Sequence, residues 1–154
     1  MKTNYIPAGY HTLTPYLVVN GAARALEFYK QAFGATEVAR MPGPGGKIMH
    51  AEIKIGDSHL MLADEFPEMD ARSPQTIGGT PVGLMLYFED ADAVFARAVS
   101  AGAKVLRPVQ DQFYGDRSGT VADPFGHKWT ISTHKEDLSM EEIQKRAAAL
   151  FGKK

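Results

Sequence analysis

The chain has 154 residues, which suffices for one domain or for two small modules with a substantial core. Its 17 basic and 18 acidic residues give a formal charge of -1, without the basic excess typical of nucleic-acid-binding proteins. The absence of cysteine excludes disulfides, thiolate metal sites and cysteine nucleophiles, and no apolar stretch approaches the roughly 18 residues of a membrane span. We therefore expect a cytoplasmic protein with neither nucleic acid nor membrane among its partners.

The first half of the chain predicts the element order β-α-β-β-β. Residues 11–19 form an apolar, β-branched run typical of a strand, and Asn20 is suited to cap the helix that follows. Gly34 lies where a left-handed residue would end that helix. Further strands are expected at 36–41, 47–55 and 59–63, with a Gly/Pro turn at 42–46.

The second half predicts the same order after an acidic, proline-containing linker at 64–81. Asp90 is suited to cap a helix that ends at Gly102, and Ser139 begins a capping box for a last helix. The apolar stripe of this last helix is expected to pack on the body of the protein or on a neighbouring chain. The strands of this half are expected at 82–88, 105–112, 119–122 and 127–133.

The two halves repeat one another. Leu17 corresponds to Leu86, 69 residues later, and Gly34 corresponds to Gly102, 68 residues later. Because there are two copies and each carries several elements, the pattern indicates a duplicated module rather than a solenoid. We predict an α+β protein of two tandem βαβββ modules with a C-terminal helix. The modules occupy 11–63 and 82–133, the linker 64–81, and the helical tail 134–154.

Segment 123–129 reads Asp-Pro-Phe-Gly-His-Lys-Trp and precedes the last strand of the repeat, and residues 28–29 are a Phe-Tyr pair near the end of the first helix. Together with the repeat, these features resemble the vicinal oxygen chelate superfamily, over about 12–133. That superfamily includes glyoxalase I, bleomycin-resistance proteins, extradiol dioxygenases and fosfomycin-resistance enzymes. The resemblance implies the glyoxalase/bleomycin-resistance fold, a cupped mixed sheet with a ligand cleft, and a homodimer. Segments similar to the PhnB-like subgroup lie at 49–56, 114–119 and 134–137.

The resemblance also implies where a metal would bind, since metal-dependent members take one ligand from each of four strands. The aligned positions in this chain are Thr14, Leu62, Gly83 and Thr130. None is a histidine or a carboxylate, the donors that such a divalent metal requires. We therefore predict no cofactor at the usual site. The alternative is a divalent metal at a displaced site, such as one formed by His50, Glu52 and His134.

Strand alternation places His50 and Glu52 on the cleft face, because Met49, Ala51 and Ile53 suit the helix-packed face. This spacing suits a charge-coupled pair in which His50 is a general base and Glu52 favours its protonated form. The alternative is that both side chains lie on a solvated strand face.

Arg117 is suited to bind a carboxylate or phosphonate, or else to form a salt bridge with Asp116 or Asp123. His59 and His127 occupy equivalent positions in the repeat and are expected to bond to nearby backbone groups. The expected ligand-binding residues are Tyr16, Tyr87, Tyr114, Arg117, Thr130 and His134.

Two functions are consistent with these residues. The first is a small-molecule-binding protein similar to bleomycin-resistance proteins, in which acidic residues of 64–81 would attract a cationic ligand. The alternative is an enzyme of lyase, isomerase or dioxygenase type that uses a displaced metal or the His50/Glu52 pair.

Overall fold

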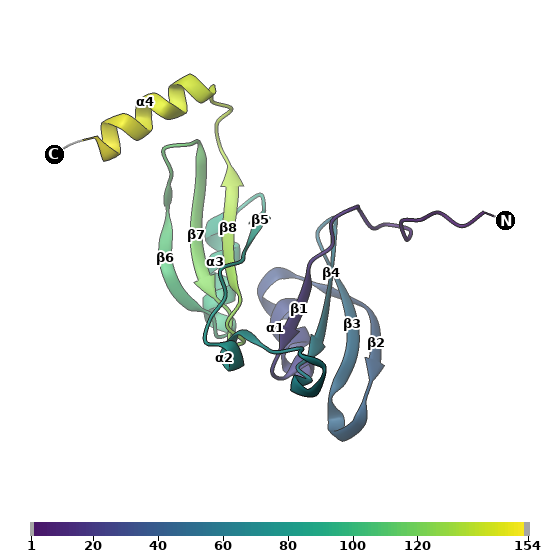
Figure 1. The fold of residues 1–154 in the computed structure, drawn as a ribbon. Coiled ribbons are helices and arrows are strands. Elements are labelled where there is room, and N and C mark those ends of the chain that lie inside the picture. The colour runs from purple at the N-terminus through teal and green to yellow at the C-terminus, as the bar shows by residue number, and fades with distance from the viewer. Residues whose placement is uncertain (1, 153–154) are drawn as a thin grey trace. The chain divides into compact units, whose positions relative to one another are not determined.

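The structure is a computed structural model, and it describes residues 2–152. The chain forms two compact units, Met1–Pro81 with Pro124–His127, and Val82–Asp123 with Lys128–Lys154. Each unit contains a four-stranded mixed sheet with a helix on one face (Figure 1). The predicted α+β class with two βαβββ modules and a C-terminal helix is confirmed. Within the described residues, no helix is long and apolar enough to cross a membrane.

The first unit is one βαβββ module preceded by an irregular segment. Its main elements are β1 (Tyr16–Val19), α1 (Ala22–Phe33), β2 (Thr36–Pro42), β3 (Ile48–Ile55) and β4 (Ser58–Asp64). The strand order is β1-β4-β3-β2, with β1 parallel to β4 and the other neighbours antiparallel. The connections contain the short helical turns η1 (Pro44–Gly46), η2 (Pro67–Met69) and α2 (Pro74–Ile77).

The first strand is shorter than predicted, because β1 begins at Tyr16 and residues 11–15 are irregular. Pro15 has no N–H to donate to a sheet. Its carbonyl still accepts a hydrogen bond from the Met61 N–H at 3.0 Å. Residues 2–15, which we call the N-terminal arm, therefore precede the sheet and are tied to it at their C-terminal end.

Helix α1 covers one face of the first sheet. Leu17, Leu62 and Ala51 are neighbours in register on β1, β4 and β3, and each is almost fully buried. Tyr29 and Phe33 of α1 are buried as well. Because side chains alternate along a strand, the intervening residues face the other way. We call that opposite side the open face of the first sheet.

The N-terminus of α1 is capped by a residue that the sequence does not suggest. Asn20 was predicted to cap it, but the N-cap is Gly21, in the left-handed conformation and without a side-chain cap. Instead, Asp64 Oδ1 accepts hydrogen bonds from the backbone N–H groups of Gly21 and Ala22, at 2.8 and 2.9 Å. Asp64 Oδ2 accepts a third from the Ile48 N–H, at 2.7 Å. The buried carboxylate thus joins the end of β4 to α1 and to β3.

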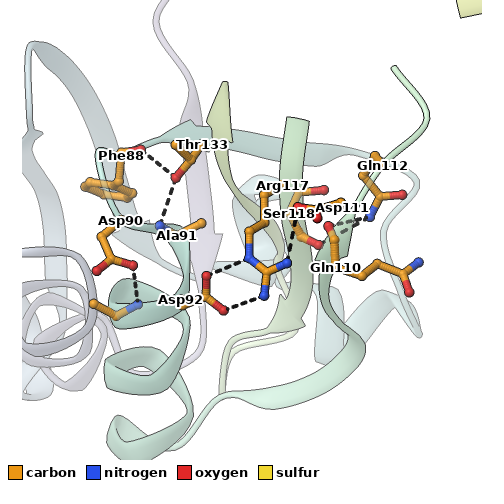
Figure 2. Close-up of polar contacts among 11 residues, drawn as sticks. Phe88, Asp90, Ala91, Asp92, Gln110, Asp111, Gln112, Arg117, Ser118 and Thr133 are labelled. Atoms are coloured by element: carbon orange, nitrogen blue, oxygen red, sulfur yellow. Dashed lines mark hydrogen bonds and ion pairs between the residues drawn. The ribbon is translucent and has the colours of Figure 1, made fainter. Parts of the chain in front are cut away.

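The second unit repeats the arrangement. It contains β5 (Gly83–Tyr87), α3 (Ala91–Ala101), β6 (Lys104–Asp111), β7 (Asp116–Ala122), β8 (Lys128–His134) and α4 (Met140–Phe151). The strand order is β5-β8-β7-β6. Asp90 caps α3 as predicted and accepts a hydrogen bond from the Ala93 N–H at 3.1 Å. Thr133 accepts from the Ala91 N–H and donates to the Phe88 carbonyl, which fixes the start of α3 against β8 (Figure 2).

Helix α3 covers the face of the second sheet that carries Trp129, Ile131 and Gly119. A Cβ atom on Gly119 would lie 2.7 Å from a ring carbon of Phe95 in α3, so this glycine permits close packing. The alternate residues, including Thr130, lie on the opposite side. We call that side the open face of the second sheet.

Helix α4 begins as predicted but is not buried. Ser139 accepts a hydrogen bond from the Glu142 N–H at 3.1 Å, whereas the Glu142 carboxylate pairs with Arg146 instead of completing the capping box. None of the residues Met140–Phe151, all of which the structure describes, is buried. Its contact with the rest of the unit includes the Phe151 ring against the Phe113 ring, with centroids 5.6 Å apart. Of its apolar stripe, Ile143 and Ala147 are half-buried whereas Met140 and Leu150 are exposed, so packing on the body is only partial, and packing on a neighbouring chain stays a prediction.

Candidate functional site

The open face of the first sheet carries a chain of hydrogen-bonded polar side chains. Tyr16 on β1 lies in register with Met61 on β4, which in turn lies in register with Glu52 on β3. The Tyr16 hydroxyl lies 2.9 Å from His50 Nδ1, and His50 Nε2 lies 2.9 Å from Glu52 Oε2. The Tyr10 hydroxyl, from the N-terminal arm, donates to Glu52 Oε1. Sequence alternation therefore placed His50 and Glu52 on the correct face, and the structure brings two phenols to them.

Hydrogen bonds link the phenol, the imidazole and the carboxyl group in a row. Partial burial raises the pKa of the Tyr16 phenol above its usual value, so this hydroxyl stays protonated at neutral pH. The two ring nitrogens of His50 bond to the Tyr16 phenol on one side and to the Glu52 carboxyl group on the other. The His50 and Glu52 side chains are 28% and 22% exposed, so a ligand can reach them. A row of a phenol, an imidazole and a carboxylate can bind polar groups of a ligand. It can also transfer the phenol proton to the imidazole.

The N-terminal arm lies beside this polar chain. The Tyr10 ring stacks on the His59 ring, with centroids 4.1 Å apart and an interplanar angle of 23°. His59 Nδ1 donates to the Gly9 carbonyl at 3.0 Å. An open hollow of about 300 Å³ lies between the arm and β4, a volume that suits a small organic group. The hollow is lined by Tyr5, Ile6, Pro7, Tyr10, His11, Thr12, Thr14 and Met61.

The alternation along β3 departs from the prediction at its start. Ala51 and Ile53 are buried as predicted, but Met49 is 41% exposed and Ile48 is buried in its place. The pairing of β2 with β3 shifts register between Met41 and Pro42, next to this position. Such a shift reverses the orientation of the residues beyond it, and the bond from the Ile48 N–H to Asp64 holds the strand there.

The second sheet carries its own polar cluster. His134 Nδ1 lies 2.7 Å from Asp116 Oδ1, and His134 Nε2 lies 2.8 Å from Asp137 Oδ1. Burial, and secondly the Asp116 carboxylate, raise the pKa of Tyr87 above its usual value, and Tyr114 contributes to the same effect. Three of the predicted ligand-binding residues, Tyr87, Tyr114 and His134, are thus brought together around Asp116.

Thr130 is also predicted to bind ligand, and it lies on the open face of the second sheet. Its hydroxyl oxygen lies 2.9 Å from that of Thr120, its partner on β7. The hydroxyl therefore already has a hydrogen-bond partner. Its role in ligand binding stays a prediction.

We expect the His134 imidazole to titrate above the ordinary histidine pKa of 6.5, chiefly because of the hydrogen bond to Asp116 and secondly because of Asp137. Since the folded-state pKa is raised, this group stabilises the fold fully below the unfolded-state value of about 6.5. The stabilisation is lost as the pH rises through the folded-state pKa. An NMR titration of the imidazole Cε1–H, assigned with His134→Gln, measures it.

The matched control for this titration is the pair Asp116→Asn and Asp137→Asn. Asp116→Asn should lower the pKa of His134 more, because the Asp116 hydrogen bond is the larger cause and its carboxylate is the more buried. A wild-type value at or below 6.5 would contradict the expected shift.

Arg117 forms a salt bridge, but not with the partners suggested from the sequence. Its guanidinium donates hydrogen bonds from Nε and Nη2 to the two carboxylate oxygens of Asp92 in α3, at 2.7 and 3.0 Å (Figure 2). Nη1 donates to Asp111 on β6 at 3.2 Å. The predicted partners Asp116 and Asp123 are therefore wrong. Because Arg117 faces α3 together with Thr133, it lies on the opposite side of the sheet from Thr130.

Three of the four acidic residues of 64–81 are already engaged in contacts. Asp64 is buried and accepts three backbone N–H groups. Hydrogen bonds from the Ser73 N–H and the Thr76 hydroxyl lower the pKa of Glu65. Asp70 pairs with Arg72 at 2.8 Å. These contacts reduce the negative potential that was expected to attract a cationic ligand.

The alignment of the superfamily's metal positions requires one correction. Leu62 is fully buried on the α1 side, whereas its neighbour Met61 lies on the open face and pairs with Tyr16. On the second sheet Thr130 pairs with Met85, which lies 69 residues after Tyr16. The counterpart of Thr130 is therefore Met61, the partner of Tyr16, also 69 residues earlier. Leu62 was one residue out of register. The corrected positions are Thr14, Met61, Gly83 and Thr130.

These four positions do not fit a divalent metal. Two hydroxyls, a thioether and a glycine supply neither imidazole nor carboxylate donors. Among residues 2–152, no group of three or more His, Cys, Asp or Glu side chains is arranged to hold a metal ion. In the alternative set of His50, Glu52 and His134, the His134 imidazole already has carboxylate partners in Asp116 and Asp137.

His59 and His127 bond to backbone carbonyls as predicted, but the prediction that these groups are local is wrong. His59 bonds to the Gly9 carbonyl, and His127 Nε2 bonds to the Val18 carbonyl at 2.9 Å. Both partners are distant in sequence. Tyr10 and Asp64 were not predicted as site or cap residues, because Tyr10 reaches Glu52, and Asp64 reaches the start of α1, across more than 40 residues of chain.

Comparison with known proteins agrees with this architecture. The model of the family described as Glyoxalase/Bleomycin resistance protein/Dioxygenase superfamily matches residues 10–131. An uncharacterised protein of Mycobacterium tuberculosis is 46% identical over 147 residues, covering 94% of this chain and 84% of its own length. The crystal structure of TioX from Micromonospora sp. ML1 is similar with a TM-score of 0.63 and 25% identity, covering 84% of this chain and 100% of TioX.

A PhnB protein is also among the solved structures with this fold, as the resemblance implied. The PhnB protein from Bacillus cereus has a TM-score of 0.61 and 19% identity, covering 80% of this chain and 99% of that protein. At this identity the likeness concerns the fold alone.

Proposed function

The chain belongs to the glyoxalase/bleomycin resistance protein/dioxygenase superfamily, and we propose that it binds a small organic molecule on the open face of its first sheet, without the superfamily's four-strand metal site. The hydrogen-bond chain Tyr16–His50–Glu52 carries this proposal. It offers a phenol, an imidazole and a carboxylate to one ligand. A fold alone does not determine function, so the proposal rests on these side chains.

Three further observations support binding at this place. Met61 supplies an apolar floor between Tyr16 and Glu52. The hollow of about 300 Å³ begins at the same methionine, and apolar walls with few polar groups are typical of ligand sites. The His50 and Glu52 side chains are partly shielded from water, which strengthens their polar interactions relative to those of fully exposed groups.

A ligand screen tests the proposal. Compounds that raise the melting temperature of the wild-type protein are titrated by calorimetry into wild type and into the variants His50→Ala and Glu52→Gln. We expect His50→Ala to weaken binding by about tenfold to a hundredfold, the usual value of one hydrogen bond to a charged group. The matched control is Lys54→Ala, because Lys54 follows on the same face of β3 but is exposed. Equal affinity in His50→Ala and wild type would contradict a site at this position.

Metal dependence is tested on the same samples. Protein purified without an affinity tag or chelator is expected to contain no stoichiometric metal by elemental analysis, and a chelator should leave ligand affinity unchanged. A stoichiometric metal that is absent from His50→Ala would overturn the metal-free proposal and favour a displaced metal site.

A metal-independent enzyme is the second candidate, and the geometry of His50 favours it. The imidazole can take the Tyr16 phenol proton while Glu52 stabilises the resulting imidazolium, so that Tyr16 acts as a base toward a bound substrate. Mass spectrometry of the ligand after incubation separates the two candidates. An unchanged ligand supports a binding protein, whereas a ligand altered by wild type but not by His50→Ala supports an enzyme.

The homodimer implied by the family stays a prediction, which sedimentation velocity measures directly.

A further inference from the structure

We propose that Tyr10 is an internal occupant of the ligand site, and that the ligand is an aromatic molecule whose ring carries a hydrogen-bond donor, as a phenol does. This inference rests on the proposed function and names its ligand class. It follows from the position of Tyr10, whose side chain is itself a phenol held on the open face by contacts that a separate molecule could make.

The contacts of Tyr10 describe such a ligand. Its ring is stacked on His59, with 4.1 Å between centroids and 23° between planes, which selects a flat aromatic group. Its hydroxyl donates to Glu52 Oε1. The other carboxylate oxygen of Glu52 is held by His50, so Oε1 is the acceptor that remains for a ligand donor. A ring with a hydroxyl or amino donor can satisfy both contacts together.

The arm that carries Tyr10 is suited to be displaced. Residues 2–15 contain neither helix nor strand. The Tyr10 N–H bonds to Pro7 within the arm, so that bond can move with it. The hydrogen bond between the Met61 N–H and the Pro15 carbonyl can stay in place while the residues before Pro15 move away. Leu13, which lies between Tyr10 and Pro15 in the chain, is 86% exposed and so does not hold the arm on the sheet. Release of Tyr10 therefore requires the loss of its contacts to Glu52 and His59 and of the Gly9 bond to His59.

The surroundings accommodate a ligand larger than the tyrosine side chain. The hollow of about 300 Å³ is lined by residues of the arm and by Met61 of β4. When the arm moves away, this space opens along Met61, where substituents on the ligand ring could lie. Tyr16 and His50 lie on the other side of Glu52 and can contact a polar substituent.

The test uses p-cresol, which is the tyrosine side chain as a free molecule, titrated by calorimetry and by NMR into the full-length chain. Wild-type protein must lose its own phenol before it binds p-cresol, which reduces the apparent affinity by the fraction of open molecules. We expect Tyr10→Ala to bind p-cresol about tenfold tighter than wild type, or more, since one hydrogen bond to a carboxylate and one ring stack no longer compete. Toluene has the same ring and methyl group without the donor, and its affinity should be far lower.

Two more variants keep the test decisive. Tyr10→Phe retains the ring but not the hydroxyl, so it should fold like wild type and bind p-cresol more tightly than wild type by a smaller factor. In the double variant Tyr10→Ala with Glu52→Ala, the gain should vanish. Equal affinity of wild type and both Tyr10 variants for p-cresol, or a gain that toluene shares or that survives Glu52→Ala, would overturn the inference.

The failure of this inference can be distinguished from that of the proposed function. If screened compounds bind in a His50-dependent manner but p-cresol does not prefer the Tyr10 variants, only the role of Tyr10 and the ligand class are wrong. If no compound binds in a His50-dependent manner, the proposed function itself is wrong.

Discussion

Asp64→Ala should lower the free energy of unfolding of the first unit by about 3 kcal/mol or more, because it leaves three backbone N–H groups without acceptors at about 1–3 kcal/mol each. Asp64 is 6% exposed, so water cannot readily replace the carboxylate. The lost bonds join α1 and β3 to the end of β4. Loosening them would also disturb His50 and Glu52, which lie on β3.

The measurement is native-state hydrogen exchange read by mass spectrometry over residues 48–55. We expect protection of β3 to fall in Asp64→Ala and to fall less in Asp64→Asn, which keeps one acceptor oxygen. The control is Asp57→Ala, an exposed carboxylate in the turn between β3 and β4. A change below about 1 kcal/mol in Asp64→Ala, the value of one ordinary hydrogen bond, would contradict the role assigned to this carboxylate.

Asp123→Ala should lower the free energy of unfolding of the second unit by about 2 kcal/mol, because the hydrogen bond from the buried indole N–H of Trp129 to this carboxylate is lost. Asp123 Oδ2 accepts a hydrogen bond from Trp129 Nε1 at 2.8 Å, and both residues are buried. This contact gives a physical reason for the spacing of Asp and Trp in the segment 123–129. The acidic residue and the indole are partners across the turn that joins β7 to β8.

Fluorescence measures this prediction directly, since Trp129 is the single tryptophan of the chain. The urea midpoint followed at this residue should fall in Asp123→Ala and change little in Asp123→Asn, whose amide oxygen can still accept. Trp129→Phe, followed by circular dichroism, removes the donor together with the need for an acceptor. If Asp123→Ala is as destabilising in the Trp129→Phe background as in wild type, the indole bond is not the cause.

Local features of the fold could be predicted because their causes lie within a few residues. The caps at Asp90 and Ser139 depend on the N–H three residues ahead, and both were predicted correctly. The alternation of β3 likewise placed His50 and Glu52 on the open face. The repeat predicted the module twice, and the sheet orders of the two units confirm it.

Features that depend on register or on distant partners could not be predicted in this way. A shift of one residue decides which side of a strand faces the helix, so Leu62 was placed on the wrong face and Met49 in the core. The partners of Arg117 depend on which strand and helix lie beside β7. Asn20 is a suitable residue type for an N-cap, but the Asp64 carboxylate, on a strand distant in sequence, already accepts the hydrogen bond at the start of α1.

The amino-acid sequence by itself determined the duplicated βαβββ architecture, the caps that start α3 and α4, and the lack of metal-ligating side chains at the superfamily's positions. These follow from periodicity, capping and residue type, which act over short distances. Only the tertiary structure decided that Tyr10 and Tyr16 join His50 and Glu52, and that Asp64 holds α1 and β3. Such contacts arise when segments far apart in the chain are brought together by strand pairing, and the local sequence contains no signal of which side chains will then meet.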